Sequence, residues 1–351
     1  MISTILNSYN ISDQCLVEPL TSGLINRTWK ITDVENQFIL QQINTEVFKK
    51  PFEVAANIRM IKEFLNEHSP DYLFVSPITD KMGRDIVHHQ HQGFFRVFPF
   101  IKGSHTIDVV TSAEQAYEAA FQFGTFAKLL SGFDVTKLHA TIPDFHNLIL
   151  RYQQFERSLE KGNQKRISQS GLLIEYLKKR VDIVNEFERL RKDIAVKQRV
   201  THHDTKISNV LFNANGKGMC VIDLDTIMPG YFISDVGDMM RTYLSPANEE
   251  EEDFSKIEIR EDFFRAIVHG YTAAMKNELT PSEKRLITYS GSFLVYMQAL
   301  RFLTDYLNND VYYGANYEEH NFVRAGNQVQ LLKEMENKKE VLDEIVLKLE
   351  N

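Results

Sequence analysis

The chain has 351 residues, of which 43% are hydrophobic and 25% are charged, and its formal net charge is −8 at pH 7. This length and composition allow a sizeable buried core and favour a division into two lobes. The acidic balance excludes a general nucleic-acid binder, because no basic stripe is available to neutralise a phosphate backbone.

Cysteine content and targeting signals indicate the compartment. The two cysteines, Cys15 and Cys220, lie in apolar runs and are expected to be reduced core residues. The N-terminal segment lacks both a positively charged region and a long apolar stretch, and no run approaches the roughly 18 apolar residues of a membrane helix. We therefore expect a cytoplasmic protein without a membrane anchor, as a monomer or a weak dimer.

The first hundred residues alternate strand signals with turn signals. Short β-branched and aromatic runs predict strands over residues 14–19, 26–32, 38–43, 84–89 and 94–101. Between the third and fourth strands, Pro51 starts a helical pattern that continues to about residue 68. A small sheet with one helix is the expected result.

Three positions in this region are candidates for nucleotide contacts. Gly23, in the first turn, allows a backbone to approach phosphate oxygens closely, or it is a plain hairpin glycine. The segment F-P-F-I-K-G at 98–103 stands where a hinge to a second lobe is expected. Backbone groups of Phe98 or Phe100 could pair there with an adenine edge, whereas Pro99 has no N–H. The alternative is an edge strand that leaves the sheet.

From residue 102 onward the pattern is mainly helical. Apolar spacing predicts helices over residues 113–131, 145–160, 171–197, 262–276, 281–307 and 323–349. A solvated loop is expected over 162–170, a sharp turn over 228–230 and an exposed acidic linker over 249–253. The predicted fold is therefore α+β and bilobal, with a small N-terminal β-sheet lobe carrying one helix (1–101) and a larger, mainly helical C-terminal lobe (102–351).

One stretch of the second lobe carries groups suited to phosphoryl transfer. It reads T-H-H-D-T-K-I-S-N-V-L-F and then V-I-D-L-D-T, which places Asn209 five residues after Asp204 and Asp223 nineteen after it. Two short apolar strands between these residues would hold the acidic ends side by side. Phosphoryl transfer needs a carboxylate that accepts the proton of the attacking hydroxyl and oxygen ligands for Mg²⁺. The alternative is a capped turn in which Asp204 accepts backbone N–H groups.

A second candidate group follows in the helix predicted over 281–307. Arg301 and Asp305 are spaced i, i+4, and Tyr312 and Tyr313 come shortly after them. An arginine beside aromatic rings suits a sugar, through hydrogen bonds and stacking. A surface salt bridge between Arg301 and Asp305, worth a few tenths of a kcal/mol, explains the same spacing, and the sequence leaves both open.

Taken together, these segments resemble the aminoglycoside phosphotransferase and choline kinase superfamily, whose members share a protein-kinase-like fold. The likeness extends over nearly the whole chain, from S-G-L-I-N-R-T at 22–28 to E-H-N-F-V-R at 319–324. Within the superfamily, the segments D-T-K-I-S-N, I-D-L-D-T and R-F-L-T-D-Y-L most resemble those of bacterial N-acetylhexosamine 1-kinases.

The resemblance implies transfer of the ATP γ-phosphoryl group to the anomeric hydroxyl of N-acetylglucosamine or N-acetylgalactosamine. It implies that Asp204 is the general base and that Asn209 and Asp223 hold Mg²⁺ and the ATP phosphates. It also implies that the sugar is contacted by Thr226, Arg301 and Tyr312.

Two features depart from the pattern. Gln41 and Gln42 stand where kinases carry a third-strand lysine, so phosphate binding would have to rely on Mg²⁺ and backbone groups, or on Lys30 or Lys206. His203 stands where related sugar kinases tend to have asparagine.

Two alternative functions are compatible with the same fold. One is a kinase of another sugar, of choline or an amino alcohol, or of an aminoglycoside. A cationic acceptor would need an acidic cluster near the pocket, for which 249–253 is the obvious candidate. The other is a non-catalytic nucleotide-binding protein, against which the intact set of Asp204, Asn209 and Asp223 argues.

Overall fold

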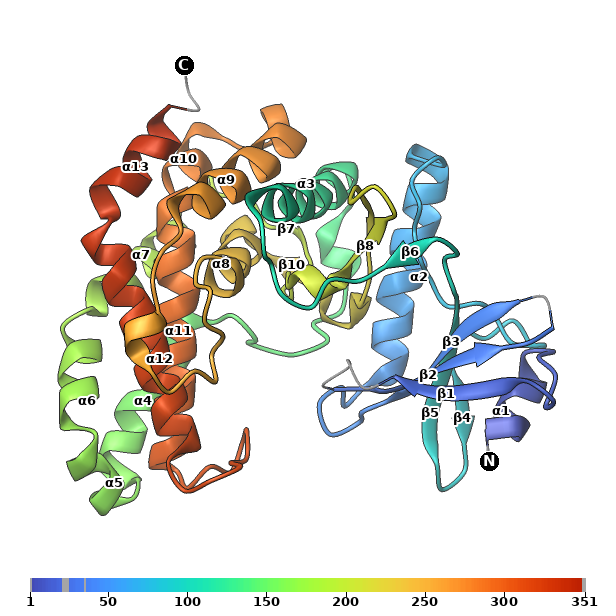
Figure 1. Ribbon diagram of the computed structural model, residues 1–351, viewed down its shortest axis with the longest axis horizontal. Helices are drawn as coiled ribbons and strands as arrows, with labels where there is room; N and C mark the ends of the chain where they lie inside the picture. Colours follow the sequence, from blue (N-terminus) through green and yellow to red (C-terminus); the bar gives the residue numbers. More distant parts are fainter. Residues whose placement is uncertain (1, 21–24, 35, 349–351) are drawn as a thin grey trace.

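The computed structural model describes residues 2–20, 25–34 and 36–348, and it has the expected bilobal α+β, kinase-like fold. Figure 1 shows the sheet of the N-terminal lobe on the right and the helices of the C-terminal lobe on the left. Gly23 lies outside the described residues. Across the part of the chain that is described, no helix combines the length and the apolar character needed to cross a bilayer.

The N-terminal lobe is a five-stranded antiparallel sheet in the order β1-β2-β3-β5-β4. Its strands are β1 (Leu16–Leu20), β2 (Arg27–Thr32), β3 (Gln37–Ile43), β4 (Val87–His89) and β5 (Gly93–Pro99). All five predicted strands are confirmed, with ends that shift by a few residues. A short helix, α1 (Ile2–Ser8), was not predicted, because seven residues are too few for a helical period to stand out.

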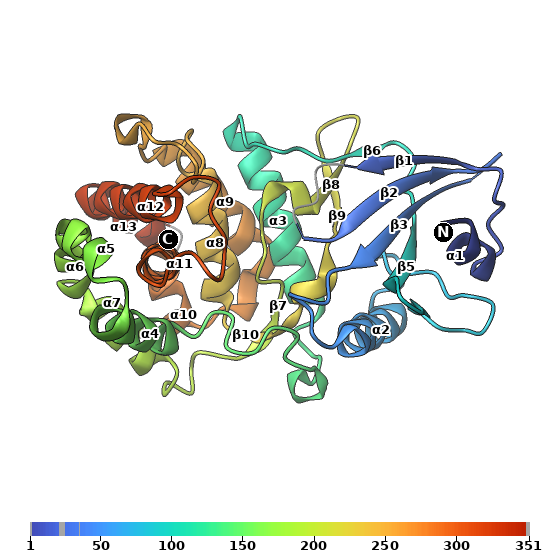
Figure 2. The same cartoon turned by 90° about the horizontal axis from the view of Figure 1, so that it is seen from below.

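Helix α2 (Pro51–His68) has the predicted bounds and lies between the sheet and the C-terminal lobe (Figures 1 and 2). Pro51 begins it, and Val54, Ile58 and Leu65 fall on its buried face. Asn57 is also fully buried there, and its amide donates to the carbonyls of His139, at 2.8 Å, and Ile227, at 2.9 Å. Through Asn57, α2 is attached to the segment that follows the candidate catalytic residues.

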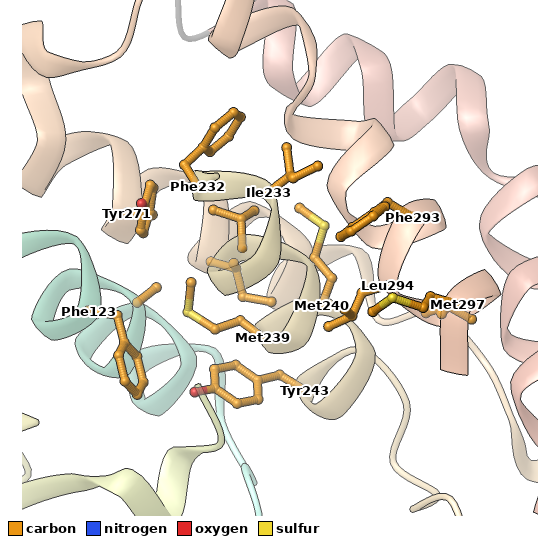
Figure 3. Packing of buried hydrophobic residues seen from close by; sticks show 14 of the residues in the cluster. Phe123, Phe232, Ile233, Met239, Met240, Tyr243, Tyr271, Phe293, Leu294 and Met297 are labelled. Atoms are coloured by element: carbon orange, nitrogen blue, oxygen red, sulfur yellow. The ribbon is translucent and has the colours of Figure 1, made fainter. Parts of the chain in front are cut away.

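The C-terminal lobe is built mainly from helices. They are α3 (Ala113–Leu129), α4 (Leu148–Lys161), α5 (Gln164–Gln169), α6 (Gly171–Lys178), α7 (Val181–Leu190), α8 (Phe232–Tyr243), α9 (Glu261–Met275), α10 (Pro281–Arg285), α11 (Ile287–Leu307), α12 (His320–Asn337) and α13 (Lys339–Leu347). Helix α8 lies at the centre of the core, where Met239, Met240 and Tyr243 pack among side chains of α3, α9 and α11 (Figure 3).

Several predicted helix bounds were wrong. The helix predicted over 171–197 breaks at Lys179 and Arg180 and ends at Leu190, and the one predicted over 323–349 breaks at Lys338. The helix predicted over 281–307 breaks at Leu286. None of these breaks contains glycine or proline, so the apolar period runs through them without a local stop signal. The loop predicted over 162–170 contains α5, whose first amides donate to the Asn163 side chain.

Short strands of the C-terminal lobe hold the candidate catalytic stretch. β8 (Val210–Asn213) and β9 (Gly218–Val221) form the predicted hairpin, and β6 (Ser104–His105) pairs with β8. The sharp turn predicted at 228–230 is instead strand β10 (Met228–Gly230), which pairs with β7 (Arg199–Thr201). In a segment of three residues, sequence patterns do not distinguish a turn from a short strand.

Helices α3 and α9 pack at close range through two glycines. A Cβ added at Gly270 of α9 would lie 2.4 Å from the Tyr117 carbonyl oxygen, and one added at Gly124 of α3 would lie 2.9 Å from the Tyr271 carbonyl oxygen. Both neighbours are backbone atoms, which can give way only if a helix moves. The close packing of α3 and α9 therefore depends on glycine, which has no side chain, at these two positions.

Gly270→Ala should lower the unfolding free energy by about 1 to 3 kcal/mol, because the added methyl forces the two helices apart. Gly171→Ala is the matched control, since a Cβ at this first residue of α6 meets open space. It should leave stability unchanged or raise it by under about 1 kcal/mol. Urea unfolding measures both, and equal effects of the two substitutions would contradict the close packing.

Candidate active site

The structure brings Asp204 and Asn209 into direct contact. Asn209 ends a short 3-10 turn (Ile207–Asn209), and its Nδ2 donates to the Asp204 carbonyl oxygen at 2.9 Å and to Asp204 Oδ2 at 3.1 Å. The Asn209 carbonyl accepts the amide of Ile222 at 2.9 Å, which brings the end of β9 beside the same turn. The predicted spacing therefore corresponds to one compact loop.

Asp223 follows β9, and its side chain is exposed. Its backbone is left-handed, with φ 60°, a conformation that aspartate tolerates better than most residues. Partial desolvation and the negative charges of Asp225 and Asp204 raise the pKa of Asp223 to about 7. Because the side chain is exposed to solvent, the neighbouring carboxylates are the main cause of this shift. No described residue donates a hydrogen bond to this carboxylate.

These donors fit a magnesium ion held together with a phosphate ligand. Asn209 uses its Nδ2 for Asp204, which leaves its Oδ1 as an oxygen ligand beside the unpartnered Asp223 carboxylate. Mg²⁺ is commonly held by one or two protein groups, with phosphates and water completing its octahedron. No cluster of three or more His, Cys, Asp or Glu suited to a metal occurs among the described residues.

Two carboxylates of α8 fix the backbone on both sides of Asp204. Asp235 Oδ2 and Oδ1 accept the amides of His202, at 3.1 Å, and His203, at 2.8 Å. Asp238 Oδ2 accepts the amide of Thr205 at 2.8 Å. Burial, opposed by the two amides of His202 and His203, raises the pKa of Asp235 to about 7. The loop therefore rests on buried carboxylates of the central core helix.

His203 has a structural explanation for its place beside Asp204. Its φ of 66° is left-handed, a region that histidine and asparagine both populate more than most residues. Its Nδ1 lies 3.1 Å from the Thr201 carbonyl and 3.2 Å from the Thr226 carbonyl, so this nitrogen carries the proton. The ring is buried against His146, and burial lowers the pKa of His203 to about 4. His203 is therefore neutral at pH 7 and serves packing.

The strand next to β3 carries a buried cation, Arg96 of β5. Gln41 of β3 accepts hydrogen bonds from Nε and Nη2 of Arg96 on β5, at 3.1 and 2.8 Å. Arg96 Nη1 lies 2.5 Å from Asp225 Oδ1, and the two side chains are 1% and 2% exposed. Asp225 Oδ2 accepts from Asn26 at 2.8 Å. Because Arg96 is sealed from solvent, it acts through Asp225 and does not reach a phosphate.

The two lysines considered as substitutes lie in different places. Lys206 Nζ is 3.2 Å from Asp204 Oδ2. Burial opposes its charge, but Asp204, Asp238 and Asp223 outweigh that effect and raise the pKa of Lys206. Lys30 stands over the Phe100 ring, with its amine 4.7 Å from the ring centroid. Lys206 is therefore the charged lysine beside the candidate catalytic carboxylate.

The predicted hinge residues lie at the edge of the N-terminal sheet. Phe98 pairs with Ile39 in the β3–β5 ladder, and its ring covers the Arg96 guanidinium at 4.9 Å. The Phe100 amide donates to the Gln37 carbonyl at 3.1 Å. An adenine contact at Phe100 would thus rest on its carbonyl oxygen, and the nucleotide roles of both phenylalanines stay predictions.

The proposed salt bridge between Arg301 and Asp305 is absent. Asp305 is 5% exposed and accepts the backbone amides of Tyr312, at 2.7 Å, and Tyr313, at 2.8 Å. This fixes the loop so that the Tyr312 hydroxyl lies 3.5 Å from Arg301 Nη2. The Arg301 guanidinium is 5.4 Å from the Phe145 ring. Arg301 therefore stands among aromatic rings.

These rings connect the loop that carries Tyr312 to the loop that carries Asp204. The Phe145 ring centroid lies 6.3 Å from that of His203, the residue before Asp204. Thr226 lies on the other side of His203, and its hydroxyl donates to the His202 carbonyl at 2.6 Å. Thr226 is buried, so its contact in this structure is with the loop. Its contact with a sugar stays a prediction, as do those of Arg301 and Tyr312.

The acidic run 249–253, predicted to be an exposed linker, is a mostly exposed connection, but its first residue is fixed by ion pairs. Glu249 lies between two arginines, with Arg241 Nη1 at 2.6 Å and Arg324 as a second ion-pair partner. Burial would raise the pKa of Glu249, but Arg241 and Arg324 outweigh it and lower the pKa. The carboxylate is charged and already neutralised, which local composition does not reveal.

Sequence reasoning missed the residues that act over long separations. Arg96, Asn26 and Asp238 had no motif, because their partners lie far away in the chain. Asp238 follows Asp235 by three residues, and this helical spacing on an otherwise apolar segment was the one available signal.

Substitution of His203 by asparagine should change how stability depends on pH. The unfolded chain takes up a proton at a pKa near 6.5, whereas folded His203 resists protonation to about 4, so stability present above pH 6.5 is lost as the pH falls. Between pH 7 and 4, wild type should lose about 3 kcal/mol relative to His203→Asn. Unfolding in urea at several pH values measures this. The exposed His269→Asn variant should follow wild type, and a constant difference between His203→Asn and wild type would contradict the assignment.

Loss of Arg96 should be among the costly single substitutions. Arg96→Met leaves the Asp225 carboxylate buried without its counter-ion and should lower stability by about 3 to 5 kcal/mol. Arg59→Met breaks a pair between Arg59 and Asp85 in which Arg59 is 49% exposed, and it should cost under about 1 kcal/mol. In addition, Arg96→Met combined with Asp225→Asn should cost less than the sum of the single changes. Equal costs for Arg96→Met and Arg59→Met would contradict the buried ion pair.

Comparison with known proteins agrees with the fold described above. A model of the phosphotransferase enzyme family (APH) matches residues 16–274. A microcompartment-associated aminopropanol kinase is 13% identical, with a TM-score of 0.66 over 97% of this chain and 98% of that chain. Amicoumacin kinase in complex with AMP-PNP, Ca²⁺ and Ami is 16% identical, with a TM-score of 0.63 over 96% and 92%. Choline kinase from Cryptosporidium parvum Iowa II is 13% identical, with a TM-score of 0.56 over 99% and 97%.

At these identities the solved structures show the shared fold. The family model, in contrast, spans well over half of the chain. The chain therefore belongs to the phosphotransferase enzyme family and is a small-molecule phosphotransferase.

Proposed function

We propose that the protein is an ATP- and Mg²⁺-dependent kinase that phosphorylates the anomeric hydroxyl of N-acetylhexosamines to give sugar 1-phosphates. One observation carries the kinase assignment: Asp204 is held by Asn209 and Lys206, close to an Asp223 carboxylate to which no residue of the described chain donates a hydrogen bond. A capped turn would have used the Asp204 carboxylate for backbone amides. Here the buried carboxylates of α8 do that instead, which leaves Asp204 for chemistry.

In the proposed reaction, Asp204 accepts the proton of the sugar hydroxyl while the hydroxyl oxygen attacks the γ-phosphorus and the bond to ADP breaks in line. Asn209 keeps the carboxylate in place through its amide. Lys206, which stays protonated, offsets negative charge beside Asp204. Bound Mg²⁺, held by Asp223 and Asn209, would neutralise the phosphate oxygens. No covalent intermediate on the protein is required.

The nucleotide is proposed to lie under the N-terminal sheet, with its adenine near Phe98 and Phe100. The Phe98 ring covers Arg96 on β5, whose guanidinium reaches Asp225 in the C-terminal lobe, and Phe100 follows the end of this strand. We place the lobe boundary between residues 101 and 102, since β5 ends at Pro99 and β6 already pairs with β8. A contribution of Gly23 to phosphate binding remains part of the proposal.

The charges near Arg301 favour an uncharged sugar over a cationic acceptor. Choline, amino alcohols and aminoglycosides need a carboxylate to receive their positive charge. In the candidate acidic run 249–253, Glu249 pairs with Arg241 and Arg324, Glu250 with Arg324 and Glu251 with Lys256. Arg301 and Tyr312 instead offer hydrogen-bond donors, which suit the hydroxyl and acetamide oxygens of an N-acetylhexosamine. The resemblance to N-acetylhexosamine 1-kinases supports the same choice.

A panel of acceptors tests the proposed substrate class. Purified protein with ATP and Mg²⁺ should release ADP with N-acetylglucosamine or N-acetylgalactosamine at a rate at least about a hundredfold above that with choline, ethanolamine or an aminoglycoside. The missing carboxylate for a cation is the physical reason. Preferential turnover of a cationic acceptor would retain the fold and refute the sugar site.

Replacement of the proposed base tests the mechanism. Asp204→Asn should lower kcat by at least about a hundredfold, because the amide cannot accept the proton, while ATP binding stays close to wild type. Asp182→Asn, an exposed carboxylate on α7, is the matched control and should retain full activity. Turnover of Asp204→Asn at the wild-type rate would remove Asp204 from the reaction.

A further inference from the structure

A pocket of about 390 Å³ lies between α4 and α11, beside the loop that carries Tyr312. These two helices pack side by side in the C-terminal lobe (Figure 2). Its volume falls in the range of small-molecule sites. Four cationic side chains line it: Arg151, Arg157 and Lys161 from one face of α4, and Arg301 from α11.

The positive charge of this pocket is not compensated by the carboxylate that lines it. Asp305 is committed to the backbone amides of Tyr312 and Tyr313. Arg301 hydrogen-bonds to Gln298 Oε1 at 3.2 Å and to the Tyr312 hydroxyl, and within the described chain it has no carboxylate partner. In a protein with a net charge of −8, such a concentration of cations is unusual and costs free energy.

Polar atoms of the lining also lack partners. The Arg151 guanidinium is fixed by the carbonyls of Asp144, at 2.9 Å, and Phe145, at 3.3 Å, while its Nε is buried without an acceptor. The hydroxyl of Thr304 is buried without a partner as well. Burial and the nearby Arg301 lower the pKa of Arg151. An oxygen-rich anion beside Arg151 and Arg301 would offset the repulsion between these two guanidinium groups.

We propose that this pocket binds a small anionic group, a phosphate, sulfate or carboxylate, between Arg151 and Arg301, with Arg157 and Lys161 attracting it from the rim. Arg301 and Tyr312 belong both to this pocket and to the proposed acceptor site. The anion is therefore either a substituent of the acceptor sugar, in which case the inference rests on the proposed function, or a separate small molecule that binds next to the acceptor.

The test compares two double variants that each remove two exposed positive charges. Arg157→Gln with Lys161→Gln on α4 alters the rim of the pocket, and Arg189→Gln with Lys192→Gln, at and just beyond the end of α7, is the control. Calorimetry measures the Kd of inorganic phosphate at constant ionic strength with ADP present to fill the nucleotide site. Wild type and the control should bind phosphate at least about tenfold more tightly than the pocket variant. Equal affinity for all three proteins would overturn the proposal.

Kinetics then distinguish the two sources of the anion. If it is a substituent, the KM of N-acetylglucosamine 6-phosphate should be at least about tenfold below that of N-acetylglucosamine in wild type and control, and this advantage should vanish in the pocket variant. If it is a separate molecule, the two sugars should have similar KM values. Added phosphate should then change the KM of N-acetylglucosamine for wild type but not for the pocket variant.

The experiment also separates the inference from the proposed function. Turnover of N-acetylglucosamine with phosphate binding that is unaffected in the pocket variant would refute the anion pocket alone. Phosphate binding that is lost in the pocket variant, without turnover of either sugar, would refute the sugar kinase assignment and support the pocket.

Discussion

The ion pair between Arg96 and Asp225 is the constraint on which the arrangement of the two lobes depends. It joins a strand of the N-terminal sheet to the segment that follows Asp223, and both side chains are sealed from water. Buried charges are tolerated only when they are paired and their remaining donors and acceptors are satisfied. Gln41 and Asn26 supply those remaining hydrogen bonds, so the sheet has one preferred position over the catalytic loop.

A second set of buried charges supports the catalytic loop from below. Asp235 and Asp238, on the central core helix α8, accept three amides around Asp204. Asp204 therefore keeps its carboxylate for Asn209 and Lys206, and in the proposed mechanism for the substrate hydroxyl. Further from Asp204, Glu249 is neutralised by arginines, and the α4–α11 pocket is basic. These local charges are the basis on which we propose a neutral or anionic acceptor.

The sequence predicted those features whose physical cause is local. The apolar spacing of α2 gave its bounds, and the five-residue interval from Asp204 to Asn209 corresponds to one turn closed by a hydrogen bond. Features that depend on residues far apart in the chain could not be predicted from the sequence. The helix breaks at Lys338 and Leu286 have no glycine or proline, and the pairing of Arg96 with Asp225 joins separate lobes. The choice between a salt bridge and a sugar contact at Arg301 required the position of the Tyr312 loop, which Asp305 determines.

The site of phosphorylation on the acceptor tests the central claim most directly. Phosphorus NMR of the product formed from ATP, Mg²⁺ and N-acetylglucosamine should show one new phosphate signal coupled to the anomeric proton of the sugar. That result would mean that Asp204 accepts its proton from the anomeric hydroxyl in a site shaped by Arg301 and Tyr312. A phosphate on another hydroxyl of the sugar, or transfer to an amino alcohol in place of the sugar, would contradict the account.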